Sequence, residues 1–284
     1  MLKKIAIVTG ANSGMGLATT IALAKQNIHV IMVCRNPEKG EQALHEAQKA
    51  SGSEDIELML CDLSSLSNIR QFCDEFKSKY PKLDILINNA GVVSLKRQET
   101  EDGFEAMLGV NHLGHFLLTN LLLDHLKAAA KGRIVVVSSG AHKWGKMDFE
   151  DPYFKKGYNV VVGYGRSKLA NVLFTRGLAQ RLEGTNVTVN SLHPGAVATN
   201  LGVDRTTGFG KNIIKLLVPF FRTAEEGAKT AIFLATSPTV EKTNGHYFYN
   251  EKEASIAKTA KDDELVERFW RWSEGEVGLS RTNR

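Results

Sequence analysis

Short apolar runs alternate with amphipathic stretches along nearly the whole chain. Runs rich in branched residues are predicted to be buried strands, at 5–10, 29–34, 56–62, 83–91, 133–139, 187–195 and 246–250. Helical spacing predicts helices between them, at 16–27, 37–50, around 112–130, 160–183 and about 223–236, with another opening at Ser64 or Ser65. Apolar strands separated by helices are typical of a parallel sheet covered on both faces. The pattern predicts an α/β, doubly wound fold with a mostly parallel, seven-stranded sheet.

The 284 residues suffice for one large domain or two small ones. Because no linker-like segment or internal repeat interrupts the pattern, a single domain over 1–284 is expected. The less regular stretches 141–161 and 197–222 are expected to be elaborations of its surface. The segment 262–272 is predicted to be a terminal amphipathic helix.

Composition is ordinary for a soluble globular protein, with 43% hydrophobic and 24% charged residues. The net charge is +5, but the basic residues are scattered, which argues against nucleic acid as a partner. Cys34, Cys61 and Cys73 form no disulfide framework or metal-ligand spacing, so reduced thiols and no metal are expected. We find no signal peptide and no apolar run near the roughly 18 residues of a membrane span. A cytoplasmic protein without a membrane span is therefore expected.

The stretch TGANSGMG (9–16) joins the first predicted strand to the first helix. Glycine permits positive φ and lets the backbone approach a ligand, and a helix N-terminus offers free N–H groups to phosphate. The glycine spacing differs from GxGxxG, and a tight turn without a ligand is the alternative. The stretch predicts a pyrophosphate site formed by Gly10, Asn12, Ser13, Gly14, Met15 and Gly16.

The second predicted strand ends in Cys34, Arg35 and Asn36, where a site for NAD would carry a carboxylate about 20 residues after the turn. A carboxylate would repel the extra phosphate of NADP, whereas the guanidinium of Arg35 suits it. Asn12, Ser13 and Lys39 could add hydrogen bonds and charge. The alternative is a surface arginine at a strand end. We expect NADP(H) to be preferred over NAD(H).

Tyr164 and Lys168 lie one helical turn apart in YGRSK, after a strand that ends in Ser138 and Ser139. Ligands bind at the carboxyl ends of strands in such sheets, so Ser139, Tyr164 and Lys168 are expected to converge there. A tyrosine hydroxyl can give a proton to the alkoxide that a hydride leaves on a carbonyl, and a nearby ammonium lowers its pKa. Ser139 can hold the substrate oxygen.

Seven motifs occur in a specific order: TGANSGMG at 9–16, CDL at 61–63, NNAG at 88–91, NHLGHF from Asn111, VSS at 137–139, YGRSK at 164–168 and HPG at 193–195. With them the chain resembles the short-chain dehydrogenases/reductases over essentially its whole length. The stretches CRNPEKGEQAL, NHLGHFLLTNLLL, SKLANVLF and NSLHPGAVATNL look most like the branch of retinol dehydrogenases and the WW-domain-containing oxidoreductase. The resemblance implies a Rossmann-type fold and an NAD(P)-dependent oxidoreductase.

The resemblance also implies roles for single residues. Tyr164 would be the general acid or base, Lys168 would hold the nicotinamide ribose, and Asn111 would anchor a water of the proton relay. The remaining implied cofactor contacts are Asp62, Leu63, Asn89, Ala90, Gly91, Pro194, Gly195 and Thr199. The alternatives are a satisfied helix residue for Asn111 and a helix cap for Asp62.

Ser139 and Tyr164 are 25 residues apart, about twice the separation in many family members. The additional residues, within 141–161, could roof the site or obstruct an oligomer interface, so monomer and dimer both stay open. The family places its substrate loop at 197–222, which here is apolar: Phe209, Ile213, Ile214, Leu216, Leu217, Val218, Phe220 and Phe221. These residues suit an apolar aldehyde, ketone or alcohol, with retinoid as one candidate, or they simply pack the loop onto the body.

Two rival functions are considered. A protochlorophyllide-reductase-like enzyme would share the glycine turn and the Tyr164–Lys168 pair, and light-dependent turnover of the pigment would reveal it. A catalytically idle NADP-binding sensor would bind the cofactor and act through partners. The presence of Asn111, Ser139, Tyr164 and Lys168 together argues against the sensor, which does not need all four.

Overall fold

The computed structural model describes residues 3–195 and 222–279. Its sheet has eight strands in the order β3-β2-β1-β4-β5-β6-β7-β8. The strands are β1 (Ile5–Thr9), β2 (His29–Cys34), β3 (Ile56–Leu60), β4 (Ile85–Asn88), β5 (Gly132–Val137), β6 (Val187–His193), β7 (Tyr247–Tyr249) and β8 (Lys252–Glu253). The first seven pair in parallel, and only β8 is antiparallel to its neighbour. The predicted doubly wound α/β fold is confirmed.

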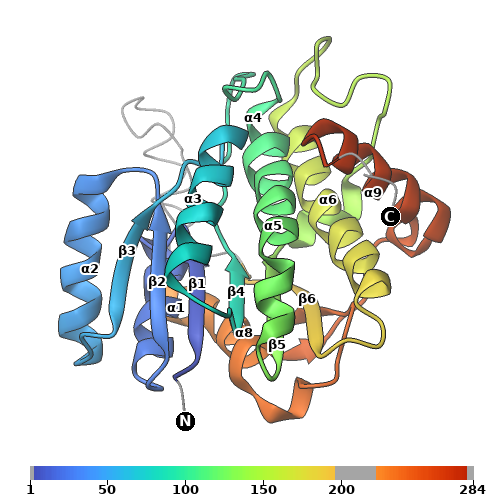
Figure 1. Ribbon diagram of the computed structural model, residues 1–284. Coiled ribbons are helices and arrows are strands. Elements are labelled where there is room, and N and C mark those ends of the chain that lie inside the picture. The colour runs from blue at the N-terminus through green and yellow to red at the C-terminus, as the bar shows by residue number, and fades with distance from the viewer. Residues whose placement is uncertain (1–2, 196–221, 280–284) are drawn as a thin grey trace.

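Helices cover both faces of this sheet (Figure 1). One face carries α1 (Gly14–Ala24), α2 (Pro37–Ser51) and α8 (Ala224–Thr236), and the other carries α3 (Leu66–Lys79), α5 (His115–Ala128) and α6 (Val160–Arg181). Successive strand residues point to opposite faces. In β1, Ile5 and Ile7 therefore pack toward α3, α5 and α6, and Ala6 and Val8 pack toward α1, α2 and α8. All of these strand residues are buried, which explains the continuous apolar runs.

Local sequence sets the helix ends near the site. Pro37 occupies the first turn of α2, and the side chain of Asn36 caps this helix by accepting from the Lys39 backbone N–H at 2.8 Å. Gly52 ends α2 with a φ of 70°. The side chain of Ser65 caps α3, so the helix expected to open at Ser64 or Ser65 begins at Leu66.

Two elements differ from the predictions. The helix expected around 112–130 consists of α4 (Ala106–Leu108), a π-helical segment η1 (Gly109–Gly114) and α5. The extra strand β8 follows a tight turn in which Asn250 and Glu251 have φ values of 53° and 59°. Its residues Lys252 and Glu253 are exposed, so no apolar pattern marks it.

The C-terminal helix α9 (Asp263–Glu276) lies on the outer side of α6 (Figure 1). A Cβ on Gly177 would come within 3.0 Å of the Trp270 ring, so glycine lets this ring approach the α6 backbone closely. Trp270 is buried and packs against Phe116 and Phe174. The expected terminal amphipathic helix is therefore present, with its apolar side on the body of the protein.

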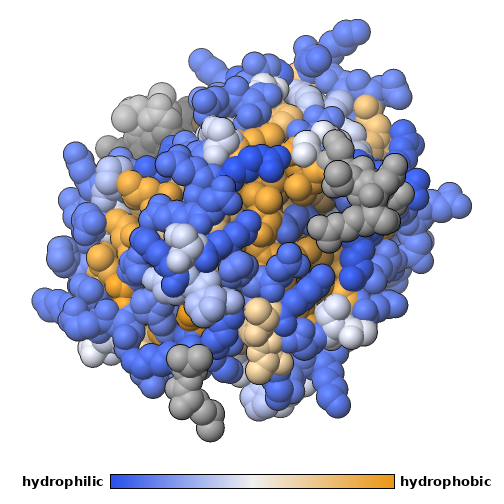
Figure 2. Space-filling view, in the orientation of Figure 1, coloured by the Kyte–Doolittle hydropathy of each residue, from blue (hydrophilic) through white to orange (hydrophobic). Residues whose placement is uncertain are grey.

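The helical run Ala106–Ala128 is long and apolar enough to cross a membrane, a length that the sequence analysis did not find. Within the most apolar 18-residue stretch of this run, 78% is buried inside the protein, as is typical of a core helix. Figure 2 shows the face that carries α3, α5 and α6, where hydrophilic side chains dominate and apolar ones gather over α5.

Candidate active site

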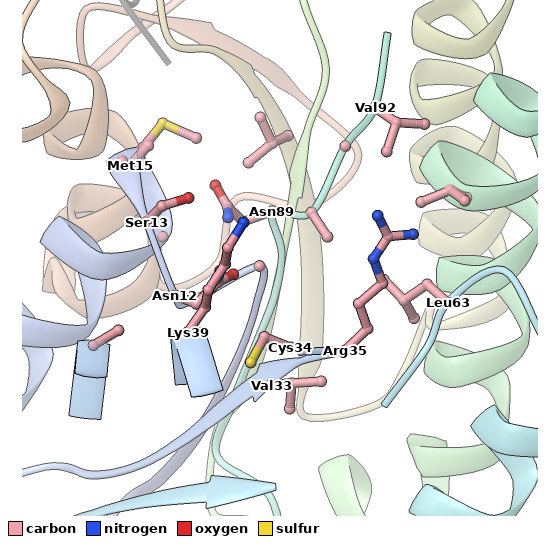
Figure 3. A pocket seen from close by; sticks show the side chains of 18 of the residues that line it. Asn12, Ser13, Met15, Val33, Cys34, Arg35, Lys39, Leu63, Asn89 and Val92 are labelled. Atoms are coloured by element: carbon pink, nitrogen blue, oxygen red, sulfur yellow. The ribbon is translucent and has the colours of Figure 1, made fainter. Parts of the chain in front are cut away.

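A cavity of about 750 Å³ opens at the carboxyl ends of the parallel strands. Every predicted cofactor-binding residue in the described chain lines it: Gly10, Asn12, Ser13, Gly14, Met15, Gly16, Arg35, Asp62, Leu63, Asn89, Ala90, Gly91, Tyr164, Lys168, Pro194 and Gly195. Ser139 lines it as well. Thr199 lies outside the described residues. Figure 3 shows part of the lining, with residues from β2, α1, α2 and the loop after β4 around one space.

The three glycines of the turn have different roles. Gly10 and Gly14 have φ values of 64° and 51°, in the left-handed region that favours glycine. Gly16 is required for space, because a Cβ there would lie 2.2 Å from the Gly10 carbonyl oxygen. The turn is fixed to the sheet by the Gly10 backbone N–H, which donates to the Val33 carbonyl at 2.8 Å.

The N-terminus of α1 faces the cavity without a side-chain cap. Ser13 occupies the N-cap position, but its hydroxyl makes no capping hydrogen bond, and no acidic residue lies in the first turn. In α2, by contrast, the side chain of Asn36 takes this role. Uncapped N–H groups at the positive end of a helix suit an anion, so the site fits the pyrophosphate of a dinucleotide.

Two cations extend over the cavity beside the end of β2. In Figure 3, the Lys39 side chain extends past Asn12 into the space that the labelled residues surround, and Arg35 extends toward Leu63. Both side chains are exposed, and neither belongs to any ion pair found in the described chain. The two positive charges are therefore available to an anionic ligand.

Cys34 lies beneath these cations as a buried, neutral group. Burial raises the pKa of its thiol, so the thiol stays protonated at neutral pH. A Cβ on Gly40 would lie 2.8 Å from the Cys34 Sγ, which shows how closely α2 packs on the strand end. The strand end that carries a carboxylate in sites for NAD is thus uncharged here.

The loop after β4 is fixed to β1 through Thr9. The Thr9 hydroxyl accepts from the backbone N–H groups of Asn89 and Ala90, each at 2.9 Å. The Asn89 side-chain amide donates to the Thr9 carbonyl at 2.7 Å. These bonds hold the Asn89–Gly91 stretch along the cavity wall.

Ser139, Tyr164 and Lys168 meet at the other end of the cavity. Ser139 precedes a short 3-10 helix, η2 (Gly140–Trp144), and its hydroxyl accepts from the Ala141 N–H at 3.2 Å. Its side chain is also near enough to Tyr164 to influence the pKa of the tyrosine. The Lys168 ammonium lies 5.7 Å from the centre of the Tyr164 ring and donates to the Val137 carbonyl at 3.2 Å. The one-turn spacing on α6 thus places both side chains at the end of β5, as the sequence analysis expects.

Burial dominates the protonation of both groups. It raises the pKa of the Tyr164 hydroxyl, and the nearby Ser139 side chain opposes this in part. It lowers the pKa of Lys168 to about 8. The structure shows no lowering of the Tyr164 pKa by the Lys168 ammonium, which donates to the Val137 carbonyl. That lowering stays a prediction.

Asn111 is fully buried in η1 and does not line the cavity. Its side-chain oxygen accepts from the Val92 N–H at 2.7 Å, and its amide donates to the Val92 carbonyl and the Ser167 hydroxyl, each at 3.1 Å. Asn111 therefore joins the loop after β4 to α6 between Tyr164 and Lys168. Its predicted role as a water anchor stays a prediction.

Several lining residues were not predicted as cofactor contacts: Val33, Cys34, Asn36, Lys39, Gln42, Ala43, Glu46, Cys61, Val92, Val110, Val137 and Ser138. One face of α2 carries four of them, at positions three or four residues apart: Lys39, Gln42, Ala43 and Glu46. Because Lys39 was already considered in the sequence, this helical spacing could have identified the other three. Of these residues, the sequence analysis considered Cys34 for its place at the strand end and Lys39 as a further positive charge.

None of the residues that line the described cavity comes from the insertion 141–161, and both alternatives for it stay predictions. The buried Arg166 side chain holds it against α6 by donating to the carbonyls of Lys146, Asp151 and Pro152. The expected substrate loop at 197–222 lies outside the described residues except for Arg222.

Comparisons with known proteins agree with this geometry. The sequence profile described as short chain dehydrogenase matches residues 4–209. Retinol dehydrogenase 14 from Homo sapiens is 46% identical, over 97% of this chain and 87% of that protein. A solved protein from Mycobacterium paratuberculosis is 32% identical with a TM-score of 0.78, over 97% of this chain and 93% of that one. The actinorhodin polyketide ketoreductase, solved with NADPH, is 25% identical with a TM-score of 0.69, over 87% and 95%.

Proposed function

Because this chain belongs to the short-chain dehydrogenase family, whose members include its retinol dehydrogenase relatives, we propose that it is an NADP(H)-dependent oxidoreductase of apolar carbonyl compounds. Its substrate would be an apolar aldehyde or ketone, or the corresponding alcohol. The family and these relatives support an oxidoreductase that acts on alcohol or carbonyl groups. The cofactor preference, the role of Tyr164 and the substrate class are the proposed parts.

The observation that carries the proposal is one cavity with two kinds of wall. The uncapped N-terminus of α1 and the cations Arg35 and Lys39 line one part, and the Ser139, Tyr164 and Lys168 side chains line the other. A dinucleotide phosphate at the first part would place its reactive end toward the second. The residues present therefore fit a nicotinamide dinucleotide.

Each polar side chain at the second part has a proposed task. The bound nicotinamide supplies or accepts the hydride. In reduction, the Tyr164 hydroxyl gives its proton to the substrate oxygen, and burial favours this protonated form by raising its pKa. Ser139 holds the substrate oxygen close to Tyr164, with which it lines the cavity. Lys168 supplies positive charge beside the tyrosine and binds the ribose.

NADP(H) is proposed over NAD(H) on three grounds. Cys34 is neutral, so the end of β2 does not repel a phosphate. Arg35 and Lys39 are exposed beside it and line the cavity. The ketoreductase with similar structure was solved with NADPH.

The proposed substrate class rests on the apolar sequence of 197–222 and on the retinol dehydrogenase relatives. Retinoid is one candidate among lipophilic carbonyl compounds. We also propose that the protein is cytoplasmic and that its oligomeric state is monomer or dimer. No role is proposed for nucleic acid or metal ions, and the described chain has no cluster suited to hold a metal.

The test follows NADPH oxidation with a panel of aldehydes and ketones, including retinal. We expect turnover by the wild type and a drop of roughly a hundredfold or more in kcat for Tyr164→Phe, because the proton donor is removed. Tyr158→Phe is the matched control, since the Tyr158 hydroxyl donates to the Ser94 carbonyl away from the cavity, and it should keep its activity.

Equal turnover by wild type and Tyr164→Phe would contradict the assigned role of the tyrosine. NADPH binding without turnover of any compound would instead support a cofactor sensor. Light-dependent turnover of protochlorophyllide would support the pigment-reductase alternative.

A further inference from the structure

A buried hydrogen-bond chain joins the end of β1 to the π-helical segment η1. The Thr9 hydroxyl lies 2.8 Å from the Nε2 of His115, and the Nδ1 of His115 lies 3.2 Å from the Asn111 carbonyl. Thr9 is fully buried, and His115 is 2% exposed. No step of the proposed mechanism uses His115.

The partners fix the tautomer of His115. The Thr9 oxygen accepts from the N–H groups of Asn89 and Ala90, so both of its lone pairs are used. Its single hydrogen therefore goes to Nε2, which is nearer than the alternative acceptor, the Ile87 carbonyl at 3.3 Å. A carbonyl only accepts, so Nδ1 carries the imidazole proton and donates it to Asn111. One neutral tautomer satisfies every group in the chain.

This chain connects two parts of the site. On one side, Thr9 holds the Asn89–Gly91 stretch that lines the cavity. On the other, the backbone carbonyl of Asn111 accepts from His115, and the Asn111 side chain holds Val92 and Ser167, the residue before Lys168. His115 bridges them through its two ring nitrogens. A shift of the imidazole would therefore move the loop after β4 relative to α6.

The charged surroundings of His115 also favour the neutral ring. Lys168 of α6 is the cation that faces it, and His112 of η1 is the other titratable group nearby. A proton on Nε2 would remove the bond from Thr9 and add a second positive charge near Lys168.

We propose that His115, as the neutral imidazole protonated on Nδ1, is a positioning residue of the oxidoreductase site. The proposal rests on the proposed function, because it assigns the bridge the task of keeping Lys168 and Tyr164 aligned with the cofactor loop. His115 itself lies behind the cavity wall and does not line it.

The first experiment replaces His115 by leucine, which removes both hydrogen bonds from a buried position. We expect His115→Leu to lower kcat with NADPH about tenfold to a hundredfold, since two hydrogen bonds that align the site are lost. The KM for NADPH should change less than kcat, because Arg35 and the glycine turn are untouched. His115→Asn, whose amide can still donate to Asn111, should recover part of kcat.

His112→Leu is the matched control. His112 lies in the same buried segment, but its Nε2 lies 2.9 Å from the Ser273 hydroxyl of α9, away from the cavity. Because this hydroxyl donates its hydrogen to the Phe269 carbonyl, Nε2 is the donor to Ser273. We expect this variant to change the unfolding temperature while kcat and KM stay at wild-type values. Equal losses of kcat in both leucine variants would mean that His115 acts only through packing, and wild-type kcat in His115→Leu would also overturn the proposal.

The second experiment needs no variant to fold and no substrate. Imidazole ¹⁵N NMR of the wild-type protein at neutral pH should show His115 with a protonated Nδ1 and a bare Nε2. An imidazolium or an Nε2-protonated ring would overturn the proposal. This measurement is independent of turnover. If the wild type were inactive toward every carbonyl compound, that result would count against the proposed function alone. The tautomer of His115 would still test the hydrogen bonds of the bridge.

Discussion

At the scale of single residues, the wall of the cavity beside β2 carries a buried neutral thiol below two exposed cations. The Cys34 thiol stays protonated, and the Arg35 and Lys39 side chains extend over it (Figure 3). A guanidinium can bind a phosphate through two parallel hydrogen bonds, which an ammonium cannot do. Of the two cations, Arg35 is therefore expected to contribute more to cofactor choice.

We predict that Arg35→Ala raises the KM for NADPH roughly tenfold to a hundredfold and leaves the KM for NADH nearly unchanged. The reason is that only NADPH carries the phosphate that the guanidinium would bind. Steady-state kinetics with both cofactors measure the effect, and Lys25→Ala serves as a control, because Lys25 is exposed at the far end of α1. Equal rises for NADPH and NADH would remove Arg35 from the phosphate site.

From the pKa of Lys168 we predict that the rate of carbonyl reduction depends on pH. Its pKa is lowered to about 8, so the ammonium is present below that pH and lost above it. We expect kcat/KM for carbonyl reduction to fall as the pH rises through about 8. Lys168→Arg, which keeps its charge, should lower the rate at neutral pH but remove this alkaline decline. A decline at the same pH in the arginine variant would assign it to another group.

Sequence motifs identify those site residues whose role follows from their own type and from neighbours a few positions away. Gly10, Tyr164 and Lys168 stand out because their residue type and spacing already imply the contact. His115 does not stand out, since its significance depends on Thr9, a residue 106 positions away. A contact between residues so far apart in sequence depends on how the strands and helices pack in register. This register could not be predicted from one sequence.

At the scale of elements, the sequence predicts the seven parallel strands because each is an apolar run between helical patterns. It misses β8, whose two exposed polar residues pair with only part of β7. It also misses the π-helical segment in Gly109–Gly114, because a single π turn changes the hydrogen bonding and keeps the same buried residues. Both omissions concern backbone geometry that apolar periodicity does not report.

The way in which the insertion 141–161 is held against α6 leads to a prediction about the free energy of unfolding. Arg166 is 5% exposed and donates to three insertion carbonyls, while its guanidinium lies 3.8 Å from the centre of the Phe154 ring. We expect Arg166→Met to lower the free energy of unfolding by about 3 kcal/mol, because it leaves these carbonyls without partners. Trypsin should then cleave faster after Lys155 and Lys156.

Arg268→Met is the control for this element. Arg268 is exposed, and its guanidinium lies 4.0 Å from the centre of the Phe149 ring of the same insertion. Its loss should cost about 1 kcal/mol or less. If both variants lost the same stability, the hydrogen bonds of Arg166 would not be what holds the insertion.

At the scale of the whole molecule, buried neutral histidines predict acid sensitivity. Burial lowers the pKa of His112 to about 3 and that of His115 to about 4, against 6.5 for an exposed imidazole. Below pH 6.5 the unfolded chain binds protons that the folded protein excludes, so stability falls as the pH decreases toward 4. At pH 5 each histidine should cost about 2 kcal/mol.

Urea unfolding at pH 7 and pH 5 measures this loss. His112→Leu should reduce the difference between the two pH values by about 2 kcal/mol, because one of the two groups is gone. This comparison separates the histidine from the carboxylates that also titrate. An unchanged difference in the variant would show that His112 does not contribute.

The order of α9 after the elements that it covers has a consequence for biosynthesis. This 14-residue helix covers the α6 face with Trp270 and joins η1 through the Ser273–His112 bond. On the ribosome α9 emerges after α6 and η1, so the apolar faces that it covers stay uncovered until its own residues have been made. Exposed apolar surface on a nascent chain promotes aggregation and recruits chaperones. A stalled or truncated product that lacks α9 would therefore be a substrate for quality control rather than a smaller working enzyme.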